Sequence, residues 1–153
     1  MIGFILIDTY TKKIEAAKNS CSKPYSLHDS RIIEIRINDD ILVLKMDRIF
    51  EYVGDEEKSH PGEISFTKVD FDECDVMVFN SPYGNEGVTE FSGKTISIQE
   101  FKDEYPDVEF EIVTETYLGY DTVYQGWIWR GEDDPLFAIM SIRNIGEMIY
   151  KLH

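Results

Sequence analysis

Residues 108–130 read VEFEIVTETYLGYDTVYQGWIWR, and this stretch decides the fold. Over 108–117 apolar and acidic side chains alternate, which is the period of a strand that buries one face. A second strand-like run spans 123–130, and residues 118–122 turn the chain between the two runs. The pattern therefore predicts an antiparallel hairpin. Its inward side chains are expected to be Val108, Phe110 and Ile112, and its outward ones Glu109, Glu111 and Glu115.

The segments around this hairpin extend the same architecture. Residues 31–37 and 41–46 alternate around the turn Asn38–Asp40, which predicts a second hairpin. Further strands are expected over residues 1–7, 63–69, 75–80, 94–98 and 136–142. Most connections are shorter than the dozen or so residues that a parallel crossover needs, so the sheet should be mainly antiparallel. No internal repeat of useful period is visible.

Short helices are expected over residues 9–18, 97–105 and 144–152. Ser97 and Glu100 have the spacing of a capping box, and Asn144 can cap the last helix. Residues 54–62 (GDEEKSHPG) are expected to form an exposed loop. The fold class predicted from these elements is α+β, with one domain spanning 1–153. It would hold a curved, mainly antiparallel β-sheet with two or three short helices packed on one face.

Composition and charge narrow the range of functions. The chain has 153 residues, enough for one domain with a core that needs no disulfide or metal. It carries 15 basic and 30 acidic residues, a net charge of −15. That charge argues against direct binding of nucleic acid or an anionic membrane, because phosphate recognition needs clustered cations. No apolar run approaches the roughly 20 residues of a membrane helix, and residues 1–7 lack signal-peptide features, so we expect a cytoplasmic protein.

Sequence motifs for catalysis or metal binding are absent from the chain. It contains no GxSxG, no P-loop and no GxGxxG. The acidic run Asp70–Asp75 (DFDECD) fails the EF-hand pattern, because a glycine is required at its sixth position. Cys21 and Cys74 are too few for a disulfide scaffold, and the sequence leaves open whether they are bridged. We therefore expect a protein without enzymatic activity, bound metal or cofactor.

Seven carboxylates flank the hairpin over 108–130. They are Glu100, Asp103, Glu104, Asp107, Glu132, Asp133 and Asp134. If the two strands pair, the clusters before and after them become neighbours, with Lys102 and Arg130 as the close cations. Like charges so placed repel each other and cost stability. Either they serve solubility alone, or they form an anionic edge that meets a basic partner.

The aromatic side chains of this region allow two interpretations. Trp127 and Trp129 share one strand face, where they either belong to the core or offer contact area to a partner. Tyr117 and Tyr120 (in TYLGYD) either pack locally or suit a binding rim. The candidate partner-binding residues are Asp103, Glu104, Asp107, Glu109, Glu111, Glu132, Asp133, Asp134, Tyr117, Tyr120 and Trp129.

These observations favour a small acidic protein that inhibits a basic protein partner by covering its cationic groove. Its most specific form is an immunity protein, an antitoxin that neutralises a toxin such as a nuclease, acting as a monomer or weak homodimer. Opposite surface potentials would speed its capture of the partner. Three alternatives stay open: a nucleic-acid-mimicking inhibitor of a defence or DNA-binding protein, a non-catalytic ligand-binding or assembly module, and an enzyme whose site matches no known motif.

Overall fold

The fold is a mainly antiparallel β-sheet, so the expected α+β class, with two or three helices, is wrong. The computed structural model describes residues 6–10, 25–81, 91–107 and 109–153. Strands hold 68% of the described residues and helical turns only 8%. The described part contains one α-helix, α2 (Ile98–Glu104), and one 3₁₀ turn, η2 (Phe71–Glu73).

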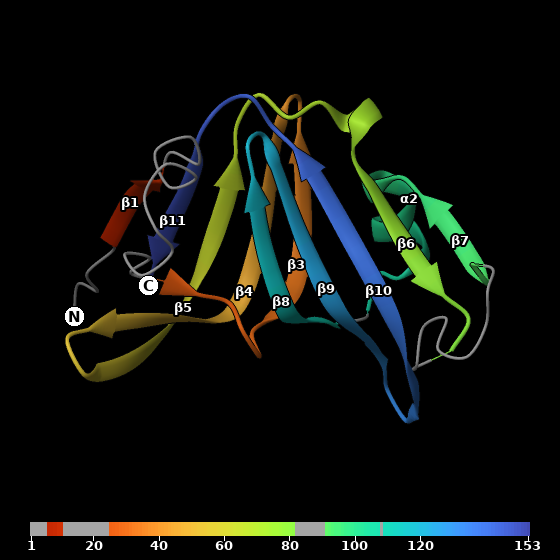
Figure 1. The fold of residues 1–153 in the computed structure, drawn as a ribbon, viewed down its shortest axis with the longest axis horizontal. Helices are drawn as coiled ribbons and strands as arrows, with labels where there is room; N and C mark the ends of the chain where they lie inside the picture. Colours follow the sequence, from red (N-terminus) through yellow and green to blue (C-terminus); the bar gives the residue numbers. More distant parts are fainter. Residues whose placement is uncertain (1–5, 11–24, 82–90, 108) are drawn as a thin grey trace.

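Eleven strands form one sheet in the described part of the chain (Figure 1). Its order is β1-β11-β5-β4-β3-β8-β9-β10-β6-β7, and β2 pairs with β4 beside this path. The first strands are β1 (Leu6–Tyr10), β2 (Tyr25–Ser26), β3 (Arg31–Asn38), β4 (Ile41–Val53), β5 (Glu56–Phe66) and β6 (Asp75–Phe79). The others are β7 (Gly93–Ile96), β8 (Glu109–Leu118), β9 (Asp121–Arg130), β10 (Asp133–Arg143) and β11 (Met148–Leu152).

The strand order is symmetric about the junction of β3 and β8. On one side β3, β4 and β5 form a meander and β11 pairs with its edge; on the other β8, β9 and β10 form a meander and β6 pairs with its edge. We call β1–β11–β5–β4–β3 the first leaf and β8–β9–β10–β6–β7 the second leaf. The strand that follows each meander in sequence thus lies in the opposite leaf.

The turns of the two meanders repeat this symmetry. The first hairpin turns hold Asp39 and Gly119 at φ of 53° and 61°, and the second hairpin turns hold Gly54 and Gly131 at 64° and 66°. Glycine adopts this left-handed conformation freely and aspartate tolerates it. Equivalent turns of the two meanders therefore each hold a residue of positive φ: Asp39 and Gly119 in the first turns, and a glycine in both second turns.

The two connections that exchange strands between the leaves meet each other. Val69 and Asn144 form an isolated antiparallel bridge. The amide of Val69 donates to the carbonyl of Asp40 (2.8 Å), and the amide of Asn144 donates to the carbonyl of Tyr120 (3.0 Å). Each connection is therefore tied to the first hairpin turn of its own meander by an equivalent hydrogen bond.

The C-terminal residues form a strand instead of the expected helix over 144–152. Asn144 does not cap a helix, because its buried side-chain amide donates to the carbonyls of Thr67 and Glu147, each at 3.1 Å. β11 pairs with β5 on one side and β1 on the other. Alternate residues of β11 are buried, so pairing with strands distant in sequence overrides the local helical spacing.

The structure also tests the helix expected near Ser97, the loop expected over 54–62 and the helix expected over 9–18. The helix near Ser97 is confirmed, because the Ser97 hydroxyl accepts a hydrogen bond from the amide of Glu100 at 3.0 Å. The exposed loop over 54–62 is wrong from Glu56 onward, where the chain already belongs to β5. The expected helix over 9–18 overlaps β1 at its first two residues, and the rest lies outside the described residues, as do residues 1–5 of the expected first strand.

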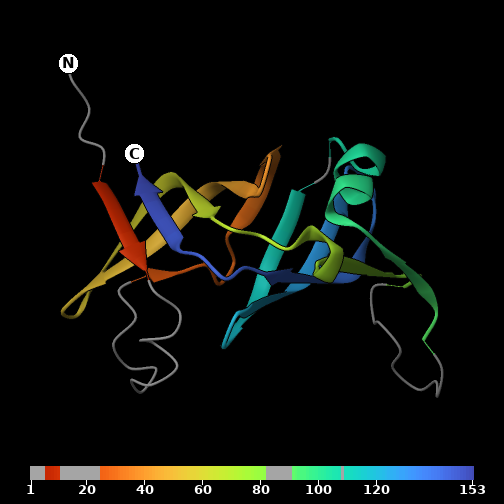
Figure 2. The ribbon, with the colours of Figure 1, turned by 90° about the horizontal axis from the view of Figure 1, so that it is seen from above.

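The two leaves share one buried face but have a short junction. Among the described residues, β3 and β8 pair at Arg31–Glu111 and Ile32–Phe110. Just before β3, the amide of Asp29 donates to the carbonyl of Ile112, and the amide of Ile112 donates to the carbonyl of Ser30, each at 2.8 Å. α2 packs on one face of the second leaf beside β6 and buries Phe101 there (Figure 2). The leaves therefore diverge from a narrow contact, and the side chains between them determine how they sit together.

Gly126 in β9 tests the packing of the second meander. A Cβ atom added at this residue would lie 1.7 Å from the carbonyl oxygen of Glu111. We expect Gly126→Ala to destabilise the protein by about 3 kcal/mol, because β8 and β9 must separate to admit the methyl group. Urea denaturation measures this change. Gly119→Asn is the control: its site is open and asparagine tolerates the φ of 61°, so a comparable loss there would contradict the explanation.

Candidate partner-binding surface

Four carboxylates flank one end of the β8–β9 hairpin in the second leaf. β8 and β9 pair as the sequence predicted, and Glu109 lies opposite Trp129 at the end of that hairpin. Asp107 precedes this pair by two residues; Glu132 in the β9–β10 turn and Asp133 and Asp134 at the start of β10 follow it by three to five residues. Paired strands lie about 4.8 Å apart, so the register brings both segments to the same end. We call Asp107, Glu132, Asp133 and Asp134 the acidic rim.

The four rim carboxylates are exposed to solvent. None of the four makes an ion pair within the part of the chain that the structure describes. Arg130 of β9 lies opposite Asp133, and its Nη2 donates to the backbone carbonyl of Asp134 at 2.8 Å. Its positive charge offsets part of the rim, which stays negative overall because four carboxylates outnumber this guanidinium.

Asp103 and Glu104 are separate from the rim. Both are exposed residues of α2. Glu104 forms an ion pair with Lys94 of β7, and Asp103 accepts a hydrogen bond from the Gln99 side chain at 3.0 Å. The structure places these two candidates on the helix that precedes the rim. The ion pair with Lys94 neutralises the charge of Glu104 there.

Glu109, Glu111 and Trp129 form one cluster with Arg31 of β3. Arg31 contacts Glu109 through Nη1 at 2.6 Å and Glu111 through Nη2 at 3.5 Å. Trp129 Nε1 donates to Glu111 at 3.1 Å, and the Arg31 guanidinium lies 5.2 Å from the centroid of the Trp129 ring. The hydrogen bond to Glu109 raises the pKa of Arg31. This cluster holds a half-buried tryptophan in a fixed position near the rim.

Arg31 was missed at the level of sequence. It meets Glu109 and Glu111 only because β3 and β8, nearly 80 residues apart, pair at Arg31 and Glu111. No pattern in the sequence around Arg31 predicts a contact between strands so far apart in the chain. The consequence is that two of the expected rim carboxylates are neutralised and do not add to the uncompensated charge.

A bulge in β8 corrects the expected face of Glu115. The register with β9 shifts between Ile112 and Thr114, so one extra residue is inserted. A bulge of this kind moves every following side chain to the opposite face. Glu115 and Tyr117 therefore point toward the buried side, and the predicted outward stripe of three glutamates ends at Glu111.

Glu115 connects the two leaves through hydrogen bonds. Its carboxylate accepts from the amide of Leu27 at 2.6 Å and from the Ser26 hydroxyl at 3.3 Å. The Tyr117 hydroxyl donates to its other oxygen at 2.7 Å and lies 3.5 Å from the Tyr150 hydroxyl of β11. Residues of the first leaf and of the second leaf thus share one carboxylate, which gives this residue a structural role.

The two candidate tyrosines are not part of an exposed rim. Tyr117 belongs to β8, and burial raises the pKa of Tyr117 and of the fully buried Tyr124 well above the ordinary tyrosine value. Tyr120 lies in the β8–β9 turn, at the opposite end of the hairpin from Glu132–Asp134, and its carbonyl accepts from the amide of Asn144. Both tyrosines therefore lie apart from the acidic rim.

Aromatic rings line up across neighbouring strands of the second leaf. Trp127 contacts Phe137, Phe137 contacts Phe79 and Phe79 contacts Phe91, with centroid distances of 5.7, 5.1 and 5.0 Å. None of these rings, nor Trp129, belongs to the main hydrophobic core. The two tryptophans are therefore half-buried residues of the face that carries Glu109 and Glu111.

Comparison with known proteins identifies no relative: no family model, curated protein or solved structure matches the chain. Within the described residues no helix is long and apolar enough to cross a membrane. Those residues also contain no group of three or more His, Cys, Asp or Glu side chains that could hold a metal ion. The geometry of the surface itself must therefore support any functional proposal.

Replacing Glu115 should loosen the contact between the leaves. Glu115→Leu removes the acceptor of the Leu27 amide and one of the partners of the Tyr117 hydroxyl, so we expect a loss of about 3 kcal/mol in the free energy of unfolding. Glu57→Leu, at an exposed glutamate of β5, should change it by no more than about 0.5 kcal/mol. Equal effects of the two substitutions in urea denaturation would refute the structural role of Glu115.

The buried tyrosines make stability depend on high pH. The folded protein holds the Tyr117 proton at pH values where an unfolded tyrosine, with a pKa of about 10, has lost it. Stability should therefore fall as pH rises above about 10. Tyr117→Phe should cost about 1 kcal/mol at pH 9 and should lose less stability than the parent between pH 9 and pH 11. An unchanged pH slope would count against a buried, protonated Tyr117.

Proposed function

We propose that this chain is a non-enzymatic inhibitor that captures a basic protein partner with the acidic rim. The observation that supports the proposal is that Asp107 and the run Glu132, Asp133 and Asp134 flank the same end of the β8–β9 hairpin, where no ion pair among the described residues neutralises them. Like charges held together cost stability in the free protein. A cationic surface docked on the rim removes that cost.

The physics of charged association fits such a role. The chain carries a net charge of −15, which attracts a cationic partner over several ångströms of solvent. Complementary potentials raise association rates toward about 10⁸–10⁹ M⁻¹s⁻¹ at low salt. Rapid capture is most valuable when the free partner is harmful. An enzyme that cleaves nucleic acid has the required cationic groove, and an anionic surface competes for that groove directly.

The specific form of the proposal is an immunity protein that neutralises a basic nuclease toxin in the cytoplasm. The cluster of Arg31, Glu109, Glu111 and Trp129 lies next to the rim and is held by hydrogen bonds, so it is rigid before binding. Tryptophan anchors fixed in this way dominate many protein interfaces, because little entropy is lost on binding. Trp129 would then supply contact area while the rim supplies attraction.

Reversing the charge of the rim turn tests the proposal. The triple variant Glu132→Lys, Asp133→Lys and Asp134→Lys should slow association with the partner by at least about tenfold at 50 mM salt. The partner is to be identified by copurification from the source cell at low and high salt, and association rates are then measured by stopped-flow fluorescence. The parent rate should fall steeply as salt increases.

The fold supplies a matched control for this triple variant. The turn between β4 and β5 is the symmetric counterpart of the rim turn, and it carries Asp55, Glu56 and Glu57 after Gly54. Replacing these three acids by lysine changes the net charge equally at a different place. Equal slowing by both triple variants would mean that only net charge matters, and the acidic rim would then lose its assigned role.

A further inference from the structure

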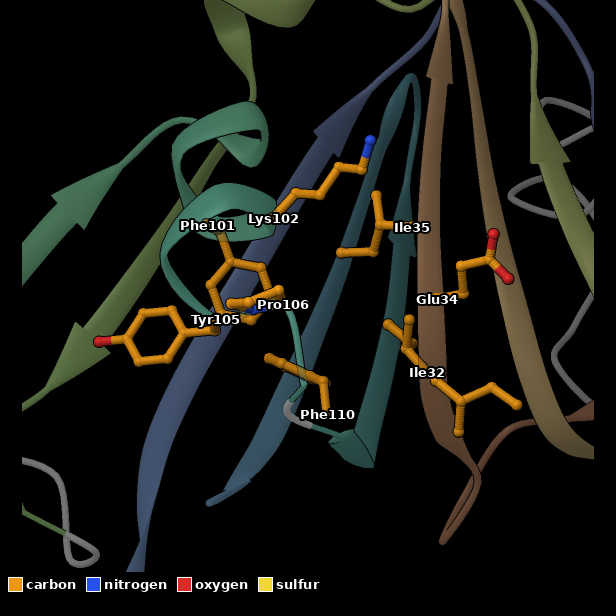
Figure 3. A pocket seen from close by; sticks show the side chains of 9 residues that line it. Ile32, Glu34, Ile35, Phe101, Lys102, Tyr105, Pro106 and Phe110 are labelled. Atoms are coloured by element: carbon orange, nitrogen blue, oxygen red, sulfur yellow. The ribbon is translucent and has the colours of Figure 1, made fainter. Parts of the chain in front are cut away.

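An apolar cleft opens between α2 and β3, beside the acidic rim (Figure 3). Its volume is about 140 Å³. Its floor consists of side chains that the fold otherwise buries: Ile32 and Ile35 of β3, Phe101 of α2 and Phe110 of β8. In Figure 3 the two isoleucines face Phe101 and Phe110 across the opening. These four side chains stay buried, so the cleft reaches the edge of the core between the leaves without exposing it.

The cleft follows from the way the leaves diverge. Among the described residues, β3 and β8 pair at Arg31–Glu111 and Ile32–Phe110 and at no later position of β3. The register of β3 with β4 shifts at Ile33, and the Ile33 side chain lies at the cleft with 38% of its surface exposed. A large aliphatic side chain exposed at the entrance of an apolar cleft is expensive for a free protein and useful at an interface.

We infer that this cleft receives an apolar side chain of the basic partner. The inference rests on the proposed function. Pro106 lines the cleft and is followed directly by Asp107 of the acidic rim, so a partner attracted to the rim meets the cleft at the same place. The occupant that fits is a phenylalanine or leucine with lysine or arginine neighbours, because the pocket is apolar and its surroundings are acidic.

The size of the cleft supports a side chain of this kind. Apolar cavities of about 150 Å³ accept a benzene molecule, so about 140 Å³ suits one phenyl or isobutyl group. Lys102 is the cation among the lining residues and Glu34 the anion, so the mouth itself is close to neutral. Selection for positive charge would come from the rim, and selection for an apolar group would come from the cleft floor. The two recognition elements can therefore be tested separately.

The test uses two basic peptides that differ in one side chain. The probes are fluorescein-labelled Lys-Arg-Phe-Arg-Lys and Lys-Arg-Ala-Arg-Lys, titrated into the full chain at 50 mM salt and followed by fluorescence anisotropy. The phenylalanine peptide should bind at least about tenfold more tightly than the alanine peptide. Methyl resonances of Ile33 and Ile35 should shift with the phenylalanine peptide and stay in place with the alanine peptide.

Two substitutions separate the cleft from a general apolar effect. Ile33→Gln should abolish the preference for phenylalanine, whereas Val53→Gln should keep it. Val53 is a matched control, because it is a β-branched residue, 50% exposed, at the far end of β4. Equal affinity of both peptides for the parent would overturn the inference, and so would an undiminished preference in Ile33→Gln.

The outcomes distinguish this inference from the proposed function. If both peptides bind equally and the triple lysine variant of residues 132–134 weakens both, the rim stands and the cleft is refuted. If the preference for phenylalanine persists while the triple variant leaves both affinities unchanged, the rim is refuted as an electrostatic site and the cleft remains. Binding of benzene with the same methyl shifts, but of neither peptide, would make the cleft a small-molecule pocket and overturn the inference.

Discussion

The exchange of strands between the leaves is the constraint on which the rest of the structure depends. β6 follows the first meander in sequence but pairs with β10, and β11 follows the second meander but pairs with β5. Each meander therefore has an unpaired edge until the other half of the chain is in place, and an open edge is a liability. The bridge between Val69 and Asn144 fixes the two crossing connections where they meet. The halves must consequently fold as one cooperative unit.

This exchange explains why the junction of β3 and β8 can be so short. The crossing strands already hold the leaves together, so direct pairing at two residue positions is sufficient. The leaves then diverge, and two different features occupy the space between them. The shared carboxylate of Glu115 joins Leu27 to Tyr117, and the cleft floored by Phe110 stays open. One feature serves stability, while the other leaves apolar surface in reach of a partner.

Local sequence signals predicted the hairpins and the capped helix at Ser97, because those elements depend on neighbours in the chain. They failed where distant partners decide. The spacing of residues 144–152 suits a helix, but pairing with β5 and β1 makes a strand. No residue in the sequence predicts the bulge before Thr114, and this bulge turns the Glu115 side chain toward the buried face. The internal symmetry was missed because the first turns hold different residues, Asp39 and Gly119, although both second turns hold a glycine followed by three acidic residues. For the site, the hairpin placed the rim in register, whereas Arg31 could not be foreseen.

The symmetry also limits what negative charge alone can mean. The two equivalent turns read GDEE over 54–57 and GEDD over 131–134, so acidity at this position is common to both leaves. Function must therefore be argued from the surroundings of a turn and not from its charge. Among the described residues, the turn of the second leaf shares its end of the β8–β9 hairpin with Asp107 and the fixed indole of Trp129, and Pro106 of the cleft directly precedes Asp107. Among the described residues, the symmetric turn lacks this combination of negative charge, a rigid aromatic side chain and a nearby apolar cleft. We therefore assign the binding role to the end of the molecule that has it.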